Sequence, residues 1–239
     1  MVNQILSPKE RGYPCAELLV TTEWLADRLN DPQVVIVDND HPGGYERAHI
    51  PGAVKFEDQL FKGSENKLFV QPEEEFAATM SQLGIANDST VVVYDSDGSH
   101  FAARLFWALR YYGHSDVRLL DGGFPKWLAE GRPIERQIPS PAATTFTPES
   151  YDARRAIRDD ILAGIDESGT AIWDVRTDEE WTGENDRGTA RGGRIPSAVH
   201  CEWKNLMTDG DVPVYKTADE LLEMLGGIGI TPEKRVMIY

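Results

Sequence analysis

Short apolar runs alternate with segments of helical period through the first half of the chain. The apolar runs, rich in Val, Ile and Leu, lie at 34–38, 91–95 and 117–121. Segments in which apolar residues recur every three or four positions lie at 21–30, 72–84, 99–113 and 124–131. Pro72 marks one helix start, and Gly84 and Gly113 mark helix ends. This alternation predicts an α/β fold with an open parallel sheet covered by helices on both faces.

The second half of the chain repeats the first. The sequence "HIPGAV" at 49–54 returns as "RIPSAV" at 194–199. The run that ends at Tyr94 returns at the same separation and ends at Tyr239. Two motifs repeated in one register indicate a duplicated domain. We therefore expect two tandem domains of the same fold.

A proline-rich stretch separates the two copies. Residues 132–150 contain four prolines and show almost no periodicity, which is typical of an interdomain linker. The predicted domains are then 1–131 and 151–239. In the second copy, helices are expected at 158–168 and 217–227, and strands at 171–176 and 236–239.

The second copy is shorter than the first. In the first copy a loop, a helix and a further strand follow Tyr94, and the same elements are expected after Tyr239. We interpret the second domain as incomplete in this chain. The segment expected after Tyr239 would then be a partner that packs on it.

Charge and cysteine content narrow the possible functions. The net charge of −16 argues against nucleic acid or an anionic membrane as a partner, because those surfaces require basic patches. No apolar run approaches the ~18 residues of a membrane span. The N-terminus lacks the apolar core of a signal peptide, and two cysteines are too few for a disulfide framework. A cytoplasmic protein is expected.

The loops after the predicted strands are candidate binding sites. In an open parallel sheet, ligands bind beyond the carboxyl ends of the strands. Backbone N–H groups and a helix N-terminus at such a loop can hold an anion or lower the pKa of a cysteine. The loops after Tyr94 and Tyr239 both have this position.

Four ordered motifs identify a family resemblance. They are "AHIPGAV", "YGHSDVRLLDGGFPKWL", "DVRTDEEWTGE" and "RGGRIPSAVHCEW". With these motifs the chain, from about Leu18 to Tyr239, resembles the two-domain rhodaneses, the thiosulfate and 3-mercaptopyruvate sulfurtransferases. The resemblance implies two tandem rhodanese-like domains. It also implies that the first is catalytically silent and that the second carries a cysteine directly after the strand ending at Tyr239.

The nucleophile position can be located in both copies. In the first copy it is Asp95, a carboxylate that cannot carry sulfane sulfur. In the second copy it is the residue after Tyr239, so no catalytic nucleophile is expected within these 239 residues. The resemblance implies that the cysteine takes sulfur from thiosulfate or 3-mercaptopyruvate and passes it to cyanide or a thiol. The implied partners are a small anionic donor and a thiophilic acceptor, with no metal or cofactor.

The expected donor-binding residues lie in and near a Gly-rich loop. The resemblance implies that Arg187 or Arg191, in "ENDRGTARGGR", holds the anionic group of the donor, whereas a solvated basic loop is the alternative. Arg176 is a further candidate, and a structural ion pair is its alternative. Glu46 matches an acidic position that reaches across the domain interface in some relatives, and a surface carboxylate is its alternative. Glu180 stands where several family members have an arginine, which leaves the choice of donor open.

The remaining cysteine and the histidines bear on functions other than sulfur transfer. Cys201 is the only cysteine of the second copy, but no helix N-terminus follows it, so an inert half-buried thiol is expected. The five histidines show no metal-ligand spacing, and His49 is expected to brace its turn. A rhodanese-fold cysteine phosphatase or arsenate reductase, and a non-catalytic rhodanese-like binding module, are the alternatives.

Overall fold

A computed structural model describes residues 5–41, 43–56 and 70–239. The chain divides into two compact units. Unit 1 comprises residues 1–152 and 209–214, and unit 2 comprises residues 153–208 and 215–239. Each unit is described by itself.

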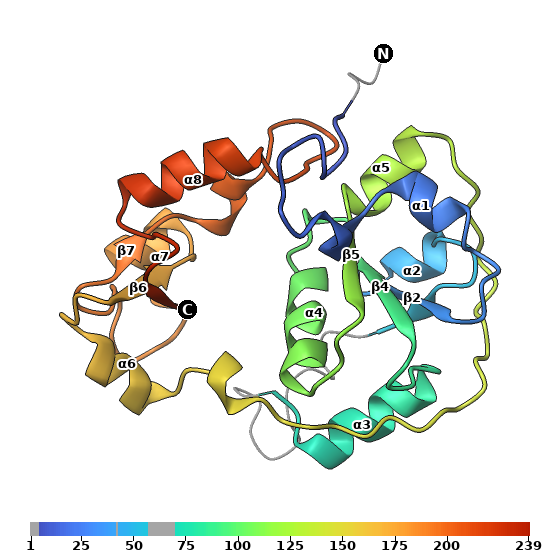
Figure 1. The fold of residues 1–239 in the computed structure, drawn as a ribbon, viewed down its shortest axis with the longest axis horizontal. Helices are drawn as coiled ribbons and strands as arrows, with labels where there is room; N and C mark the ends of the chain where they lie inside the picture. Colours follow the sequence, from blue (N-terminus) through green and yellow to red (C-terminus); the bar gives the residue numbers. More distant parts are fainter. Residues whose placement is uncertain (1–4, 42, 57–69) are drawn as a thin grey trace. The chain divides into compact units, whose positions relative to one another are not determined.

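Unit 1 is built on a five-stranded parallel sheet. Its strands are β1 (Leu19–Val20), β2 (Val34–Asp38), β3 (Val54–Lys55), β4 (Thr90–Tyr94) and β5 (Val117–Leu120). Their order is β1-β5-β4-β2-β3, with β4 at the centre. Figure 1 shows β2, β4 and β5 side by side, with α4 next to them. The three central Val residues of β4 are fully buried, as expected for a strand covered on both faces.

Helices cover the sheet of unit 1. They are α1 (Thr22–Ala26), α2 (Gly44–Arg47), α3 (Glu73–Gln82), α4 (Ala102–Tyr111) and α5 (Gly123–Ala129), with the 3-10 helix η1 (Ala16–Leu18). The Thr21 side chain accepts a hydrogen bond from the Trp24 N–H and caps α1. Trp127 of α5 is fully buried in a core cluster with Leu25 of α1 and Val92 of β4. This packing fixes α1 and α5 on the sheet.

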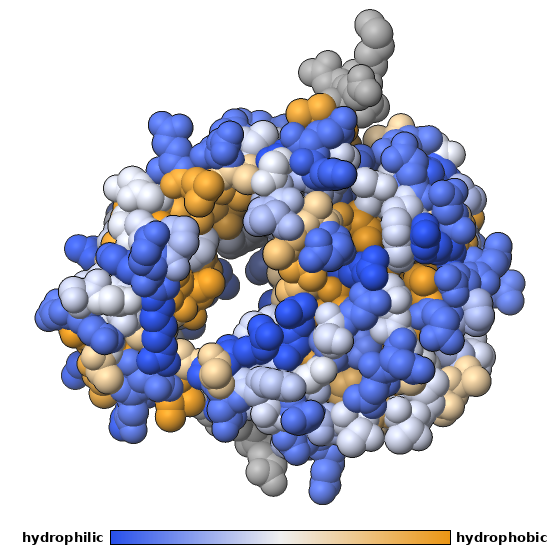
Figure 2. Space-filling model, in the orientation of Figure 1, coloured by the Kyte–Doolittle hydropathy of each residue, from blue (hydrophilic) through white to orange (hydrophobic). Residues whose placement is uncertain are grey.

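Unit 2 contains a smaller sheet of the same kind. The parallel strands β6 (Thr170–Asp174), β7 (Val199–His200) and β8 (Arg235–Ile238) have the order β7-β6-β8. This order repeats β3-β2-β4 of unit 1. The helices are α6 (Arg158–Gly164), α7 (Asp178–Thr182) and α8 (Ala218–Gly227), with the 3-10 helices η3 (Asp152–Arg154) and η4 (Trp203–Leu206). Figure 2 shows hydrophobic side chains at the surface over α8, where Leu222 is exposed.

The structure confirms the predicted parallel α/β class and differs from the predictions at several boundaries. The helix expected from residue 99 begins at Ala102, because residues 95–101 form a loop around the Asp95 side chain. The short helices α2 and α7 were not expected. Residues 132–150, predicted as a linker, run along unit 1, where the Glu135 backbone forms a two-bond bridge with His49. None of the helices in the described part of the chain combines the length and apolar character needed to cross a membrane.

Asp38, at the end of β2, gives unit 1 a pH-dependent stability. Burial raises the pKa of Asp38 to about 6, although hydrogen bonds from the Tyr94 hydroxyl and the Asp40 N–H act in the opposite direction. The folded state therefore binds the proton more tightly than the unfolded state, where the pKa is about 3.9. This contribution is fully present below about pH 4 and is lost as pH rises through 6.

We expect Asp38→Asn to be more stable than the wild type at pH 7.5, by a margin that disappears at pH 4, where the wild-type Asp38 is protonated. The expected gain is about 2 to 3 kcal/mol, because the variant keeps the hydrogen-bond acceptor and has no carboxylate to ionise. Urea unfolding between pH 4 and 7.5 measures it. The exposed Asp88→Asn is the matched control, which should follow the wild type. Parallel pH profiles of Asp38→Asn and the wild type would contradict the prediction.

Candidate functional site

The same three-residue arrangement lies at the carboxyl edge of both sheets. In unit 1 the Tyr94 hydroxyl donates to Asp38 and accepts the Ile50 N–H at 3.1 Å. In unit 2 the Tyr239 hydroxyl donates to Asp174 and accepts the Ile195 N–H at 3.0 Å. Each tyrosine therefore joins the strand before the candidate loop to the "IP" turn. The duplication is present in side-chain geometry as well as in sequence.

A cation distinguishes the two copies of this arrangement. Two hydrogen bonds join Arg176 to Asp174, from Nε to Oδ1 at 2.9 Å and from Nη2 to Oδ2 at 2.5 Å. Burial acts to raise the pKa of Asp174, but the Arg176 hydrogen bonds outweigh it and hold that pKa below its ordinary value. Asp38, for which the described residues provide no such arginine, has a raised pKa instead. Unit 2 thus has an ionised buried carboxylate at this edge.

In unit 1 the candidate loop is wrapped around Asp95. One carboxylate oxygen accepts the N–H groups of Asp97 at 3.0 Å and Ser99 at 2.8 Å. The other accepts those of Phe101 and Ala102, both at 2.8 Å. The last of these donors is the first residue of α4, so the helix N-terminus also faces the carboxylate. Burial raises the pKa of Asp95, and the four N–H bonds oppose that rise.

The Asp95 carboxylate occupies the place that a bound anion would take. Its four donors converge as they do in backbone anion-binding loops. Gly123 approaches the same loop so closely that a Cβ there would lie 2.3 Å from the Asp95 carbonyl oxygen. The loop of unit 1 therefore has the form of an anion site whose ligand is a side chain of the same loop.

In unit 2, the arginine loop, residues 184–194, is attached to the body of the unit at several points. The Arg187 Nη2 donates to the buried Glu180 carboxylate at 3.1 Å. Burial acts to raise the pKa of Glu180, but the hydrogen bonds from Arg187 and the Thr177 N–H hold it below its ordinary value. The Arg187 side chain is still 66 % exposed. The guanidinium of Arg187, a candidate donor-binding residue, is therefore already paired with a carboxylate.

Stacked rings hold the other end of the arginine loop. The Arg194 guanidinium lies over the Trp181 ring, 4.4 Å from its centroid, and the Trp181 ring stacks on His200 at 4.9 Å. The His200 Nε2 lies 2.8 Å from the Arg176 carbonyl oxygen. Among the described residues, nothing pairs with the guanidinium of Arg191. Arg191 is thus the loop arginine with an uncommitted charge.

Cys201 lies at a core position of unit 2. Its N–H donates to the Asp174 carbonyl at 3.2 Å, as the N–H of the fully buried Phe56 donates to Asp38 in unit 1. The thiol packs against the core cluster, and burial raises its pKa. A raised pKa disfavours the thiolate that nucleophilic chemistry requires. The geometry agrees with an inert thiol.

The remaining candidates are placed as follows. The Glu46 carboxylate pairs with Lys55 at 2.7 Å within unit 1. His49 is fully buried, stacks on Tyr45, and lies 2.8 Å from the Tyr45 carbonyl and 3.1 Å from the Gln137 carbonyl. It therefore braces its turn, as expected. In the described ranges, no cluster of three His, Cys, Asp or Glu side chains could hold a metal ion.

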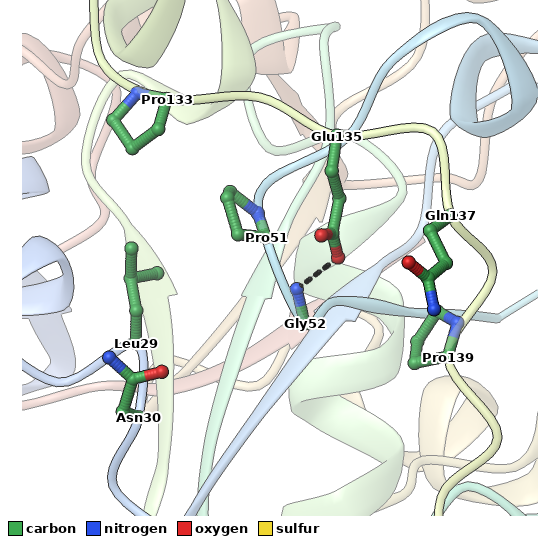
Figure 3. A pocket seen from close by; sticks show the side chains of 8 residues that line it. All are labelled: Leu29, Asn30, Pro51, Gly52, Pro133, Glu135, Gln137 and Pro139. Atoms are coloured by element: carbon green, nitrogen blue, oxygen red, sulfur yellow. Dashed lines mark hydrogen bonds between the residues drawn. The ribbon is translucent and has the colours of Figure 1, made fainter.

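A pocket of about 470 Å³ lies elsewhere in unit 1 (Figure 3). It is lined by Leu29, Asn30, Pro51, Gly52, Pro133, Glu135, Gln137 and Pro139. The first two precede the start of β2, and the next two precede the start of β3. None of the residues that line the pocket belongs to the Asp95 loop. The Glu135 carboxylate within it accepts the Gly52 N–H at 2.5 Å.

Sequence reasoning assigned no role to two side chains that pack near the arginine loop, Trp181 and His200. Trp181 and His200 both lie in quoted motifs, but no periodicity distinguishes a ring that stacks on an arginine from a core ring. The repeat offered one signal. Arg194 occupies the position of His49, and a loop arginine in place of a buried histidine requires a different partner.

Comparison with known proteins identifies similar sequences and structures. The rhodanese-like domain family matches residues 21–130. The sulfur carrier protein TtuD of Thermus thermophilus is 39 % identical, over 95 % of this chain and 84 % of its own length. A putative thiosulfate sulfurtransferase of Saccharopolyspora erythraea is 34 % identical, over 93 % of this chain and 81 % of its own. The crystal structure of SseA from Escherichia coli, described as a 3-mercaptopyruvate sulfotransferase, aligns with a TM-score of 0.82 and 29 % identity, covering 92 % of this chain and 87 % of SseA. The chain belongs to the rhodanese family.

Proposed function

We propose that the protein is a sulfurtransferase that moves sulfane sulfur from a small anionic donor to a thiophilic acceptor through a cysteine persulfide. The observation that carries the proposal is the Asp95 loop. In unit 1 the loop after Tyr94 directs four N–H groups at Asp95, and the repeat assigns the nucleophile to the equivalent position of unit 2. In unit 2 that position is the residue after Tyr239, and the arginine loop of the same unit supplies cations. The relatives named as thiosulfate sulfurtransferases support the same class.

The proposed chemistry proceeds in two displacements. The cysteine thiolate attacks the outer sulfur of thiosulfate, the S–S bond breaks, and sulfite leaves with the bonding electrons. Cyanide or a thiolate then attacks the outer sulfur of the persulfide, and the enzyme thiolate leaves. Converging N–H groups favour the thiolate in both steps. With 3-mercaptopyruvate as donor, the C–S bond breaks, its electrons leave with the enolate of pyruvate, and a proton converts this enolate to pyruvate.

The net charge of the chain determines which side chains are suited to bind the donor. An anionic donor approaches a chain of net charge −16, so cations at the site must offset the repulsion. Arg191 has no carboxylate partner within the described part of the chain and is the proposed anion-binding residue. Because Arg187 is already paired with Glu180, we propose that it contributes less than Arg191 to donor binding. We propose a cytoplasmic location, where free thiols stay reduced.

The assay of choice follows thiocyanate formation from thiosulfate and cyanide by the full-length protein, including the residues after Tyr239. We expect turnover, and we expect Cys201→Ser to retain it, because Cys201 is a core thiol. Replacing the residue after Tyr239 by serine should abolish turnover. Mercaptopyruvate in place of thiosulfate distinguishes the two donors.

A phosphatase or arsenate reductase of the same fold is the competing class. Hydrolysis of p-nitrophenyl phosphate, or reduction of arsenate with a thiol, without thiocyanate formation would replace our proposal by that class. Loss of activity in Cys201→Ser alone would assign the nucleophile to Cys201. Inactivity with every donor would favour a non-catalytic binding module.

A further inference from the structure

The Arg176 guanidinium touches three separate segments of unit 2. It binds Asp174 at the end of β6 through two hydrogen bonds. Its Nη2 also donates to the Gly193 carbonyl, at the end of the arginine loop, at 2.9 Å. Its Cζ lies 5.0 Å from the centre of the Tyr239 ring, directly after β8. One planar cation thus joins two strand ends and the loop.

The chemistry of this contact requires an arginine. The Asp174 side chain is fully buried, so its charge needs a permanent partner. The hydrogen bonds with Asp174 raise the pKa of Arg176 further, and the group stays charged. A guanidinium can donate from two edges at once, whereas a lysine ammonium offers a single point of charge. Arg176 uses Nε and Nη2 for the carboxylate, and the same Nη2 also donates to the Gly193 carbonyl.

The base of the arginine loop is closed at this same place. A Cβ on Gly183 would lie 2.8 Å from the Gly193 nitrogen, and one on Gly192 would lie 2.9 Å from the Gly183 oxygen. The two ends of the loop therefore pass each other in backbone contact. The Arg176 hydrogen bond to Gly193 attaches this crossing to β6.

The described part of unit 1 shows no such contact. The residue two positions after its buried Asp38 is Asp40, where unit 2 has Arg176. The Asp40 carboxylate accepts a hydrogen bond from Ser96, and the turn before Ile50 is braced by His49. The arginine contact is thus a property of the unit to which we assign catalysis.

From these contacts we infer that Arg176 is a positioning residue that fastens the arginine loop to the strand ends before the nucleophile. It acts on the donor through Gly193 and the loop, and its own guanidinium faces protein groups. The kinetic part of this inference rests on the proposed function; the structural part does not. The contacts of Arg187 with Glu180 and of Arg194 with Trp181 attach the same loop to unit 2 at two further points, one on each side of Arg191.

Limited digestion with trypsin tests the structural part. The loop contains three cleavage sites, after Arg187, Arg191 and Arg194. In Arg176→Ala we expect cleavage within 184–194 about tenfold faster than in the wild type, because local opening limits proteolysis of a folded loop. The exposed Arg158→Ala is the matched control in unit 2 and should leave the rate unchanged. Arg176→Lys, which keeps the charge beside Asp174, should lie between.

Kinetics of the full-length protein test the remaining part. In Arg176→Ala, kcat/KM for thiosulfate should fall about tenfold, while sulfur transfer from a preformed persulfide to cyanide stays unchanged. Unchanged loop cleavage in Arg176→Ala overturns the inference. If that variant does not fold, Arg176→Lys decides by the same two measurements. Faster loop cleavage in Arg176→Ala, together with a full-length wild type that transfers no sulfur, would support the structural part of the inference and reject the proposed function.

Discussion

Replacing Arg191 by alanine is expected to lower kcat/KM for thiosulfate about 10 to 150 fold. A charge-assisted hydrogen bond to a ligand contributes roughly 1.5 to 3 kcal/mol, which corresponds to that range. Within the described residues Arg191 lacks a carboxylate partner, so its whole charge is available to the donor. Steady-state rates at varied thiosulfate measure the effect. Transfer from a preformed persulfide to cyanide should be nearly unaffected, because only the first half-reaction holds the anion.

Two further variants make the Arg191 result specific. Arg187→Ala should give a smaller loss, because Arg187 shares its charge with Glu180. Arg136→Ala, whose side chain donates to the Arg47 carbonyl in unit 1, should behave as wild type. Wild-type donor kinetics in both loop variants would show that the loop is a solvated basic segment. The anion would then be held by other residues.

Asp95→Ala should destabilise unit 1 by about 3 to 5 kcal/mol. The change removes one carboxylate and leaves four N–H groups without their acceptor at a buried position. Hydrogen exchange should accelerate at the amides of Asp97, Ser99, Phe101 and Ala102. Urea unfolding, monitored together with exchange at these amides, gives the magnitude.

Asp97→Ala is the control for the Asp95 variant. The Asp97 carboxylate is partly exposed and lies 3.3 Å from His100, so its loss should cost less than about 1 kcal/mol. Its N–H remains available to Asp95 in the variant. Equal, small effects of the two substitutions would show that the loop is held by its backbone without the carboxylate.

Hydrophobic period predicted the sheets well because burial on both faces leaves a clear pattern. The runs at 34–38 and 117–121 became β2 and β5 almost to the residue. The same period failed at residues 99–101, where apolar spacing continues a helix that the structure does not contain. There the Asp95 carboxylate captures N–H groups at Ser99 and Phe101, and Ser99 adopts a positive φ of 69°. A polar contact along the chain overrode the helical pattern.

The candidate site was predictable only in part. Sequence placed the arginines of the "ENDRGTARGGR" loop together and located the nucleophile position by the repeat. It did not rank Arg187 against Arg191, because a carboxylate partner for one of them depends on α7 turning Glu180 toward the loop. The three contacts of Arg176 involve groups from two strand ends and from a loop backbone, which no local pattern records.

The Asp95 loop also determines how the stability of unit 1 depends on the anions in solution. A protein stabilised by a dissociable anion gains stability as the free concentration of that anion rises. Asp95 is tethered to the amides it satisfies, so its occupancy is the same in any buffer. The folding of unit 1 is thereby uncoupled from sulfate, phosphate or donor levels. At a fixed pH, the stability of unit 1 should therefore not change with the concentration of these anions.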